Sequence, residues 1–244
     1  LLSMFAFYLF CIFSLGKADS YLKAYKQVDK HYFETGLTKA CKQKLDKLGV
    51  AVLIGQQGSG KTLTAVHIMR STNYADWGKQ KVMSWEDLLL SNFTKNTIVY
   101  IDNLFDGFLY NQEVEKWLDS LCYFYFDCIK PKDNIRLIIT AKTDAIEKAF
   151  SFIKSDTLSL MKTCSVQEDL FPLSIEEKMG IFDNQIKLAK ELKGINLHFT
   201  REKLKVELQD KKCPLGFPLC AHMYAFEKQS YFRDTSIFDN PRTY

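Results

Sequence analysis

Three short runs of mostly apolar residues stand out in the middle of the chain, at residues 50–54, 97–101 and 135–140. Each run is rich in Val or Ile, and the first ends directly at Gly55. Short β-branched runs of this kind are typical of strands that are buried on both faces of a parallel sheet. The segment 81–84 is predicted to form a further, shorter strand.

Between these runs, apolar residues recur at the spacing of one helical face. This spacing predicts helices from Leu63 to Arg70 and from Asp144 onward, and a longer helix over 113–128 that ends before Pro131. Strands that alternate with helices predict an α/β fold, with three layers (αβα) and a parallel sheet covered on both faces. The apolar face of the longer helix consists of residues 114, 117, 118, 121, 124, 125 and 128.

The pattern changes near residue 170, after which strong strand signals are missing. Ser174 and Glu177 have the spacing of a capping box, which opens a helix. We therefore expect an α/β domain over 17–170, including a helical lead-in, and a small all-helical domain over 171–244. The helices of the second domain are predicted at 175–193, 200–209 and 218–227.

The first residues, 1–16, carry no charged side chain. They have the apolar length of a signal peptide or anchor but lack its basic n-region, and they are shorter than the roughly 20 apolar residues of a membrane span. The third alternative is a segment that does not belong to the folded domain, and we expect these residues to lie outside the fold. Residues 17–48 are polar and rich in Lys, and are predicted as a solvated helical lead-in.

The composition narrows the class of protein. The chain has 244 residues, of which 47% are hydrophobic and 25% charged, with 11 Gly and 5 Pro. These values indicate a globular protein of one large domain, or one domain with a small partner, and exclude a collagen-like or disordered chain. The net charge of +4 is too small to indicate nucleic acid, and a basic-aromatic motif is missing, so we expect no nucleic-acid partner.

The seven cysteines form no Cys-x-x-Cys pair, and their number is odd. Reduced thiols in a cytosolic protein explain this usage better than a disulfide framework. Cys213, Cys220 and His222 lie close together in the sequence, but a zinc site would need a fourth ligand and a tighter spacing. We interpret these cysteines as structural thiols.

The strongest motif follows the first apolar run and matches G-x-x-x-x-G-K-[ST], the phosphate-binding loop. Glycines allow successive backbone amides to curl around phosphate oxygens, and the following helix turns its N-terminus to the anion. We predict that this loop, with Leu63 after it, binds a nucleotide, that Lys61 reaches the β- and γ-phosphates and that Thr62 ligates Mg²⁺. The loop consists of Gly55, Gln56, Gln57, Gly58, Ser59, Gly60, Lys61 and Thr62.

Polar residues follow the second apolar run. Asp102 ends this run, where an acidic residue can hold Mg²⁺ through water. Asn103 comes next, and its amide can orient a water molecule but cannot accept a proton from it. Asp106 supplies a base only if a turn brings it to the site, and is otherwise a solvated loop residue. We predict slow or absent hydrolysis, with these three residues as the catalytic candidates.

Thr140, Lys142 and Pro218 are further candidates for nucleotide contact. Thr140 and Lys142 follow the third apolar run, where a polar or cationic side chain can lie beside the γ-phosphate. The alternative is an ordinary strand-to-helix turn with a solvated Lys142. Pro218 suits the first turn of a helix and offers a rigid apolar ring. On physical grounds alone, a simple helix start explains this proline.

Together these residues resemble a STAND-type P-loop NTPase, and most closely the novel STAND NTPase family of large animal signalling proteins. The resemblance implies an ATP-driven signalling switch in which a helical domain closes over ATP or ADP. It also implies that Pro218 contacts the adenine and that Thr140 senses the γ-phosphate. The segments that carry the resemblance are GQQGSGKT at 55–62, TIVYIDN at 97–103, LIITAKTD at 137–144, LSIEEK at 173–178 and GFPLCAHMYA at 216–225.

Two departures from the family pattern concern hydrolysis rather than binding. The family usually has a second acid where this chain has Asn103, and often Arg where it has Lys142. An active P-loop ATPase or kinase-like enzyme is one alternative, and a degenerate P-loop scaffold that binds only proteins is another. The intact Lys61, Thr62 and Asp102 count against the scaffold. A kinase would need clustered Arg residues, whereas this chain has Arg at 70, 136, 201, 233 and 242.

The expected ligands are ATP or ADP with Mg²⁺. As partners we expect a second copy of the chain or other domains of a longer protein from which this switch module is cut. Because ATP is plentiful in the cytosol, a cytoplasmic location is expected. Membrane anchoring or secretion is the alternative if residues 1–16 are a signal segment.

Overall fold

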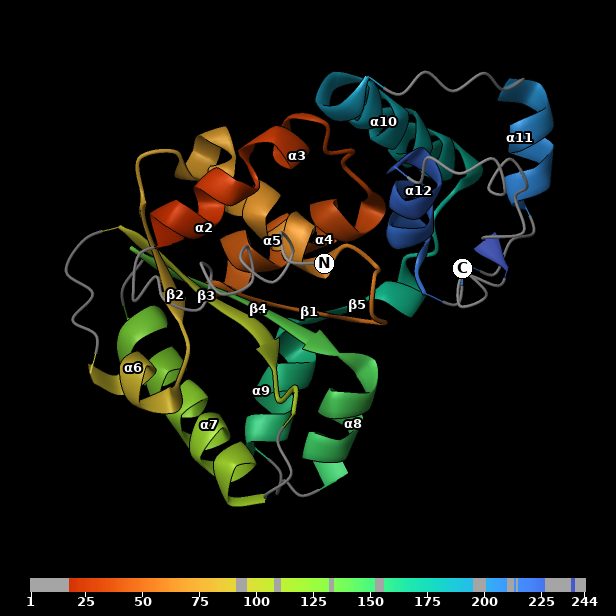
Figure 1. Cartoon of the computed structure of the whole chain (residues 1–244). Coiled ribbons are helices and arrows are strands. Elements are labelled where there is room, and N and C mark those ends of the chain that lie inside the picture. The colour runs from red at the N-terminus through yellow and green to blue at the C-terminus, as the bar shows by residue number, and fades with distance from the viewer. Residues whose placement is uncertain are drawn as a thin grey trace.

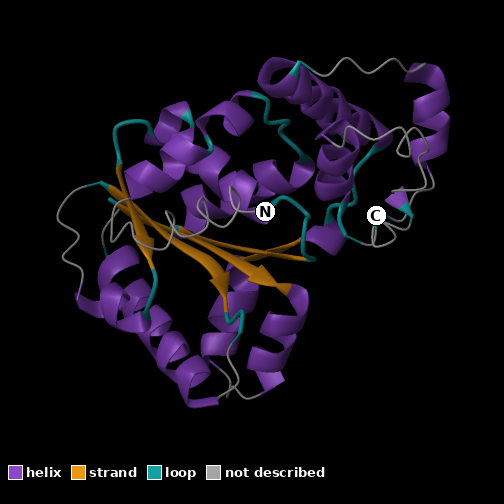
Figure 2. Ribbon diagram, viewed as in Figure 1, coloured by secondary structure: helices purple, strands orange, loops and turns teal. Residues whose placement is uncertain are grey.

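The chain forms a parallel sheet covered by helices, with a further group of helices beside it (Figure 1 and Figure 2). This arrangement confirms the predicted three-layer α/β fold with a helical region after it. The predicted leader, 1–16, lies outside the described residues. The computed structural model describes residues 18–90, 96–107, 111–131, 134–151, 156–194, 201–209, 213, 215–226 and 238–239.

Within these ranges the sheet has the strand order β2-β3-β4-β1-β5, and every pair is parallel. The strand predicted at 81–84 begins earlier, at Gly78, and the three-residue strand β5 was not predicted because it contains no apolar run. The strands are β1 (Val50–Gly55), β2 (Gly78–Val82), β3 (Thr97–Leu104), β4 (Ile135–Lys142) and β5 (Ser165–Gln167).

The register of the sheet sets the position of the candidate site. Gly55 at the end of β1 lies opposite Lys142 at the end of β4, and Ile101 of β3 lies opposite Ile139. The carboxyl ends of these neighbouring strands therefore meet at one edge, where ligands bind in open α/β sheets. Asp102 follows Ile101 at this edge.

Helices from the first part of the chain cover one face of the sheet (Figure 1). The prediction that 17–48 is a solvated lead-in is wrong for α4, whose Leu37, Cys41 and Leu45 are buried. These three residues recur every fourth position, so they share one helical face. The Lys residues between them make the segment look polar when it is judged by composition alone. The helices of this face are α2 (Ala18–Ala24), α3 (Lys26–Lys30), α4 (Gly36–Leu48) and α5 (Lys61–Arg70).

A second set of helices covers the opposite face and packs on the apolar residues of β1, β3 and β4. The long helix predicted at 113–128 is present, but its last part, Phe124–Ile129, is a π-helix. The helix predicted from Asp144 begins one residue earlier, at Thr143. The helices of this face are α6 (Trp85–Leu90), α7 (Asn111–Tyr123), α8 (Thr143–Ser151) and α9 (Asp156–Cys164).

The helices after β5 build a core of their own. They are α10 (Ile175–Lys193), α11 (Arg201–Gln209) and α12 (Phe217–Phe226), and their core includes Phe182, Leu208 and Cys220, with Phe238 from beyond α12 packed among them. The predicted capping box is present, because the Ser174 side chain accepts from the Glu177 amide and the Glu177 side chain accepts from the Ser174 amide. The predicted helix ends at 200 and 227 lie outside the described residues.

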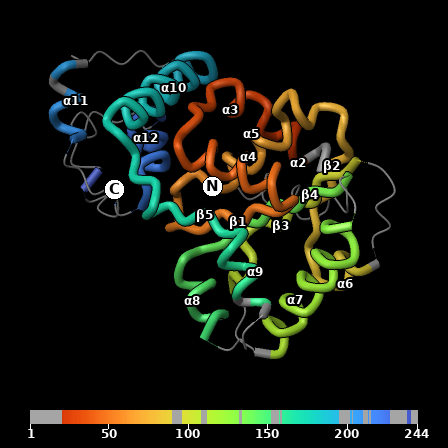
Figure 3. The backbone as a smooth tube through the Cα atoms, turned by 180° about the vertical axis from the view of Figure 1, so that it is seen from behind, coloured from red at the N-terminus to blue at the C-terminus, as the bar shows by residue number. Residues whose placement is uncertain are grey.

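The helical group contacts the α/β part next to α4 and β5, as the view from behind shows (Figure 3). The Glu177 carboxylate accepts a hydrogen bond from the amide of Gly36, 2.7 Å away, at the start of α4. Gly180 of α10 lies so close to the Phe33 ring that an added Cβ would overlap it. None of the helices among the described residues combines the length and the apolar content needed to cross a membrane.

Candidate functional site

The phosphate-binding loop connects β1 to α5. Gly58 and Gly60 have φ values of 79° and 88°, in the left-handed region that glycine tolerates best. The Lys61 ammonium donates to the carbonyl oxygens of Gly55, at 2.9 Å, and Gln56, at 2.5 Å. Burial lowers the pKa of Lys61. The loop thus holds a buried cation at its centre, on a helix N-terminus that itself favours an anion.

Glu168 lies against the start of the loop and was missed by the sequence analysis. Its carboxylate accepts from the amide of Gln56 at 3.0 Å. A Cβ added to Gly55 would lie only 2.9 Å from the Glu168 Cβ, so glycine is required for this approach. Among nearby charges, Glu168 acts most strongly on Lys61 and raises its pKa against the effect of burial. Glu168 belongs to no motif, since it begins a short 3₁₀ turn directly after β5, a strand that was itself not predicted.

Asp102 connects the loop to the neighbouring strands. Its Oδ1 accepts from the Thr62 hydroxyl at 3.1 Å and from the Thr140 hydroxyl at 2.9 Å. Tyr100 donates to the same oxygen at 2.6 Å. The structure therefore brings together three of the predicted site residues, Thr62, Asp102 and Thr140, from α5, β3 and β4. Tyr100 could have been found from strand periodicity, because residues two apart share one face.

The second carboxylate oxygen of Asp102 has different partners. Tyr21 of α2 donates to Oδ2 at 3.0 Å, and the Lys81 ammonium of β2 lies 3.5 Å from it. Burial alone would raise the pKa of Asp102, but hydrogen bonds from Tyr100 and the charge of Lys81 hold it below its ordinary value. Neither Tyr21 nor Lys81 belongs to a motif, and the sequence carries no signal that would select them.

The other candidates near Asp102 point to different partners. Asn103 has a φ of 52°, and its side chain is exposed. Its backbone amide donates to the Thr140 hydroxyl at 2.8 Å. Asp106 is exposed and pairs with Lys142 at 2.9 Å. Lys142 is therefore ion-paired across the strand ends rather than simply solvated. The catalytic roles of Asn103 and Asp106 stay predictions.

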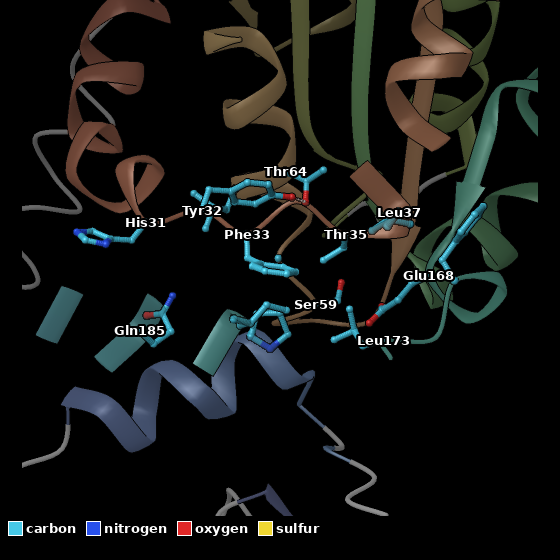
Figure 4. Close-up of a pocket in the computed structure, with 15 residues that line it drawn as sticks. His31, Tyr32, Phe33, Thr35, Leu37, Ser59, Thr64, Glu168, Leu173 and Gln185 are labelled. Atoms are coloured by element: carbon cyan, nitrogen blue, oxygen red, sulfur yellow. Dashed lines mark hydrogen bonds between the residues drawn. The ribbon is translucent and has the colours of Figure 1, made fainter. Parts of the chain in front are cut away.

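A cavity of about 60 Å³ lies beside the loop, between the α/β part and the helical group (Figure 4). Ser59, Gly60 and Leu63 line it from the loop and α5, and Pro218 lines it from α12. In Figure 4 Phe33 lies in the middle of the lining, Gln185 lies at one end and Glu168 at the other. The remaining lining residues are His31, Tyr32, Thr35, Leu37, Thr64, Phe171, Leu173 and Ile181.

The helical group contacts the loop directly. The amide of Leu219 donates to the carbonyl oxygen of Gly58 at 3.2 Å. Gly216 has a φ of 79°, and an added Cβ would lie 2.6 Å from the carbonyl carbon of Gly58. A Cβ added to Gly60 would lie 3.5 Å from Cγ of Pro218. The turn before α12 and the phosphate-binding loop therefore pack backbone to backbone.

The model of the family described as Novel STAND NTPase 3 matches residues 32–188. The chain belongs to this family. The match covers the whole phosphate-binding loop, Asp102 and Thr140, and it ends within α10. The predicted resemblance to STAND NTPases is thus confirmed, and the chain is a nucleotide-binding P-loop module.

The fold of this STAND NTPase is similar to the folds of solved structures. The chain is similar to NtrX from Brucella abortus in complex with ADP, with 15% identity, a TM-score of 0.53, and coverage of 80% of this chain and 51% of NtrX. A second NtrX structure from Brucella abortus gives a TM-score of 0.54 at 15% identity, with coverage of 84% and 53%. The chain spans about half the length of these structures. No curated protein matches the chain significantly.

The donor set of this STAND NTPase fits a magnesium ion. Mg²⁺ prefers oxygen ligands and is usually held by one or two protein oxygens together with phosphates and water. The Thr62 hydroxyl and the Asp102 carboxylate supply two such oxygens 3.1 Å apart, at the end of the loop. Lys61 lies in the same loop and supplies the charge that phosphates need.

Proposed function

We propose that the chain is a nucleotide-dependent switch module that binds Mg²⁺ with ATP or ADP and hydrolyses ATP slowly or not at all. The observation that carries this proposal is the contact between Leu219 and Gly58, which joins the helical group to the phosphate-binding loop. A ligand held in the loop would lie next to this contact and to Pro218, so its binding energy would depend on how the two parts are arranged. This dependence is the physical requirement for a switch.

The cavity beside the loop lies where the base and sugar of the nucleotide would enter, and at about 60 Å³ it must widen to hold both. Its lining is largely apolar, with Phe33, Leu37 and Pro218 among the side chains that a flat base can contact. Ser59 and Gly60 belong to both the loop and the cavity, so phosphates in the loop place the sugar at the cavity. The preference for an adenine base is supported by the STAND family resemblance and by NtrX, which was solved with ADP.

The proposed slow hydrolysis follows from the groups around Asp102. The residue after it is Asn103, whose amide cannot take a proton from an attacking water. The nearest further acid in the sequence, Asp106, is held by Lys142 at 2.9 Å and exposed. Thr62 and Asp102 would hold the magnesium ion, which neutralises phosphate charge when bound. The groups for binding are therefore present, whereas neither Asn103 nor Asp106, the candidates described next to Asp102, is positioned as a base for proton abstraction.

Thermal unfolding tests this proposal on the full chain. Mg²⁺-ATP and Mg²⁺-ADP are titrated into the wild type, into Lys61→Ala and into Lys47→Ala, whose exposed Lys lies in the last turn of α4. At about 100 times the Kd, the ligand should stabilise the wild type and the control by about 2.7 kcal/mol, and Lys61→Ala by much less. The absence of a shift in the wild type would remove the proposal. An equal shift in Lys61→Ala would show that the nucleotide binds outside the phosphate-binding loop.

A further inference from the structure

The carboxylate of Asp102 is saturated with donors. Oδ1 accepts from three groups of the loop and the central strands, Thr62, Tyr100 and Thr140. Oδ2 faces Tyr21 at 3.0 Å and Lys81 at 3.5 Å. An ionised carboxylate has about four lone-pair sites, so these five donors leave no site for a magnesium-bound water.

The two partners of Oδ2 differ from the rest in origin. Tyr21 belongs to α2, a helix of seven residues at the start of the described chain, and Lys81 belongs to the edge strand β2. They also contact each other, because the Lys81 ammonium lies 4.0 Å from the centre of the Tyr21 ring. The Tyr21 and Tyr100 rings are 5.9 Å apart. Tyr21 and Lys81 thus form one packed unit on the outer side of Asp102.

We propose that Tyr21 and Lys81 form a closing pair, which holds the Asp102 carboxylate by its Oδ2 oxygen until a magnesium-bound nucleotide draws the carboxylate away from the pair. This inference rests on the proposed nucleotide function. The Lys81 ammonium supplies the positive charge that Asp102 needs in the closed state, and a divalent ion brought close to it would be repelled. Metal binding and the closing pair therefore compete for the same carboxylate.

Displacement of the pair has a consequence for α2. Tyr21 holds α2 to Asp102 through its hydroxyl, and Leu22 of the same helix is buried against the sheet. A helix of seven residues is not stable in water by itself, so it depends on these contacts. Loss of the Tyr21 contact should therefore loosen the whole helix. In this way the state of the metal site is transmitted to the N-terminal end of the described chain.

Hydrogen–deuterium exchange of the full chain tests this transmission. The amides of Ala18–Ala24 are followed without ligand, with ADP in excess EDTA, and with ADP in excess Mg²⁺. We expect faster exchange of these amides with Mg²⁺ and ADP only, while the amides of the phosphate-binding loop become protected in both nucleotide samples. Unchanged α2 exchange under Mg²⁺, together with a protected loop, would overturn the closing pair and leave the proposed function standing.

Two variants separate the competition from simple loss of packing. Tyr21→Phe removes the hydroxyl but keeps the ring, and Lys81→Met removes the charge but keeps the length. Each should lower the Kd for Mg²⁺-ADP by about fivefold to tenfold, because a competing hydrogen bond or charge is gone. Tyr74→Phe is the matched control, since it removes a tyrosine bond to a carboxylate, Asp46, at 2.9 Å.

The outcomes of this comparison are distinct. Tighter Mg²⁺-ADP binding by Tyr21→Phe and Lys81→Met, with wild-type affinity for Tyr74→Phe, supports the closing pair. Unchanged or weaker binding by the first two variants would contradict it, because Tyr21 and Lys81 would then support the bound state. Failure of the wild type to bind ADP with or without Mg²⁺ would instead remove the proposed function itself.

Discussion

The amide of Leu219 donates a hydrogen bond to the carbonyl oxygen of Gly58, 3.2 Å away. This bond joins two parts of the chain that have separate hydrophobic cores, one around the sheet and one within the helical group. It lies next to Gly60 and Pro218, so the junction is also one wall of the cavity. A change at this contact should therefore alter ligand binding as well as stability.

Gly216→Ala should disturb the junction directly. The added Cβ would lie 2.6 Å from the carbonyl carbon of Gly58, at a φ of 79° that already disfavours alanine. We expect a loss of unfolding free energy well above 1 kcal/mol, together with weaker ADP binding, as measured by denaturant unfolding and calorimetric titration.

Gly194→Ala is the control for this variant. Gly194 has a φ of 66°, but an added Cβ would meet nothing within 4 Å. It should lose only about 1 kcal/mol from backbone strain and keep the wild-type affinity for ADP. Equal effects of the two variants on stability and affinity would show that the contact with Gly58 does not matter.

Glu168→Gln should strengthen nucleotide binding. The Gln56 amide keeps an oxygen acceptor, but the negative charge beside the phosphates is removed. We expect the Kd for Mg²⁺-ADP to fall by about threefold at low salt, with a smaller change at high salt. The neighbouring exposed Asp169→Asn serves as the control. Weaker binding by Glu168→Gln would mean that its carboxylate contacts the ligand favourably.

Thr140→Val should destabilise the strand ends. The Thr140 hydroxyl is fully buried, accepts from the Asn103 amide and donates to Asp102. Valine has the same shape but leaves both groups without this partner, which costs about 1 to 3 kcal/mol. Urea unfolding without nucleotide measures this loss. A stability equal to that of the wild type would show that the bridge between β3 and β4 is replaced by water.

Asp29 should make the free energy of unfolding depend on pH in the acid range. Burial alone would raise its pKa, but hydrogen bonds from His67 and Arg70 hold it below the ordinary value. A carboxyl with a lowered pKa in the folded state adds stability above its unfolded pKa of about 3.9, and this stability is lost as the pH falls through the folded pKa. Unfolding free energy measured from pH 7 down to pH 3 should therefore fall less steeply in Asp29→Asn than in the wild type.

Exposed Asp76→Asn is the control for the acid series. It should be parallel to the wild type over the whole range. A slope in Asp29→Asn as steep as that of the wild type would place the acid sensitivity elsewhere in the chain.

The sequence predicts the parts of this molecule that depend on local order. The apolar runs give β1, β3 and β4, and the loop motif gives the position of Lys61 and Thr62. The convergence of Thr62, Asp102 and Thr140 follows from parallel strands whose carboxyl ends share an edge. These features are predictable because each residue is marked by a run or motif within one short segment, and a parallel sheet then brings the ends of those segments together.

The features that the sequence hides depend on contacts between distant segments. Tyr21 reaches Asp102 from 81 positions away, and Glu168 reaches Gln56 from 112 positions away. Neither contact has a periodic signal, since only packing of the helices and strands brings them together. α4 is hidden for another reason, because Lys residues between Leu37, Cys41 and Leu45 make a buried helix look solvated.

Photo-crosslinking of the full chain with an azido-adenine derivative of ADP tests most directly the claim that one nucleotide is held by both parts of the molecule. Peptide mapping by mass spectrometry locates the labelled residues, with excess ADP as competitor. The account predicts labelling, abolished by ADP, in the segment 31–37 and around Pro218, which line the same cavity. Labelling of the α/β part alone, with none around Pro218, would contradict it.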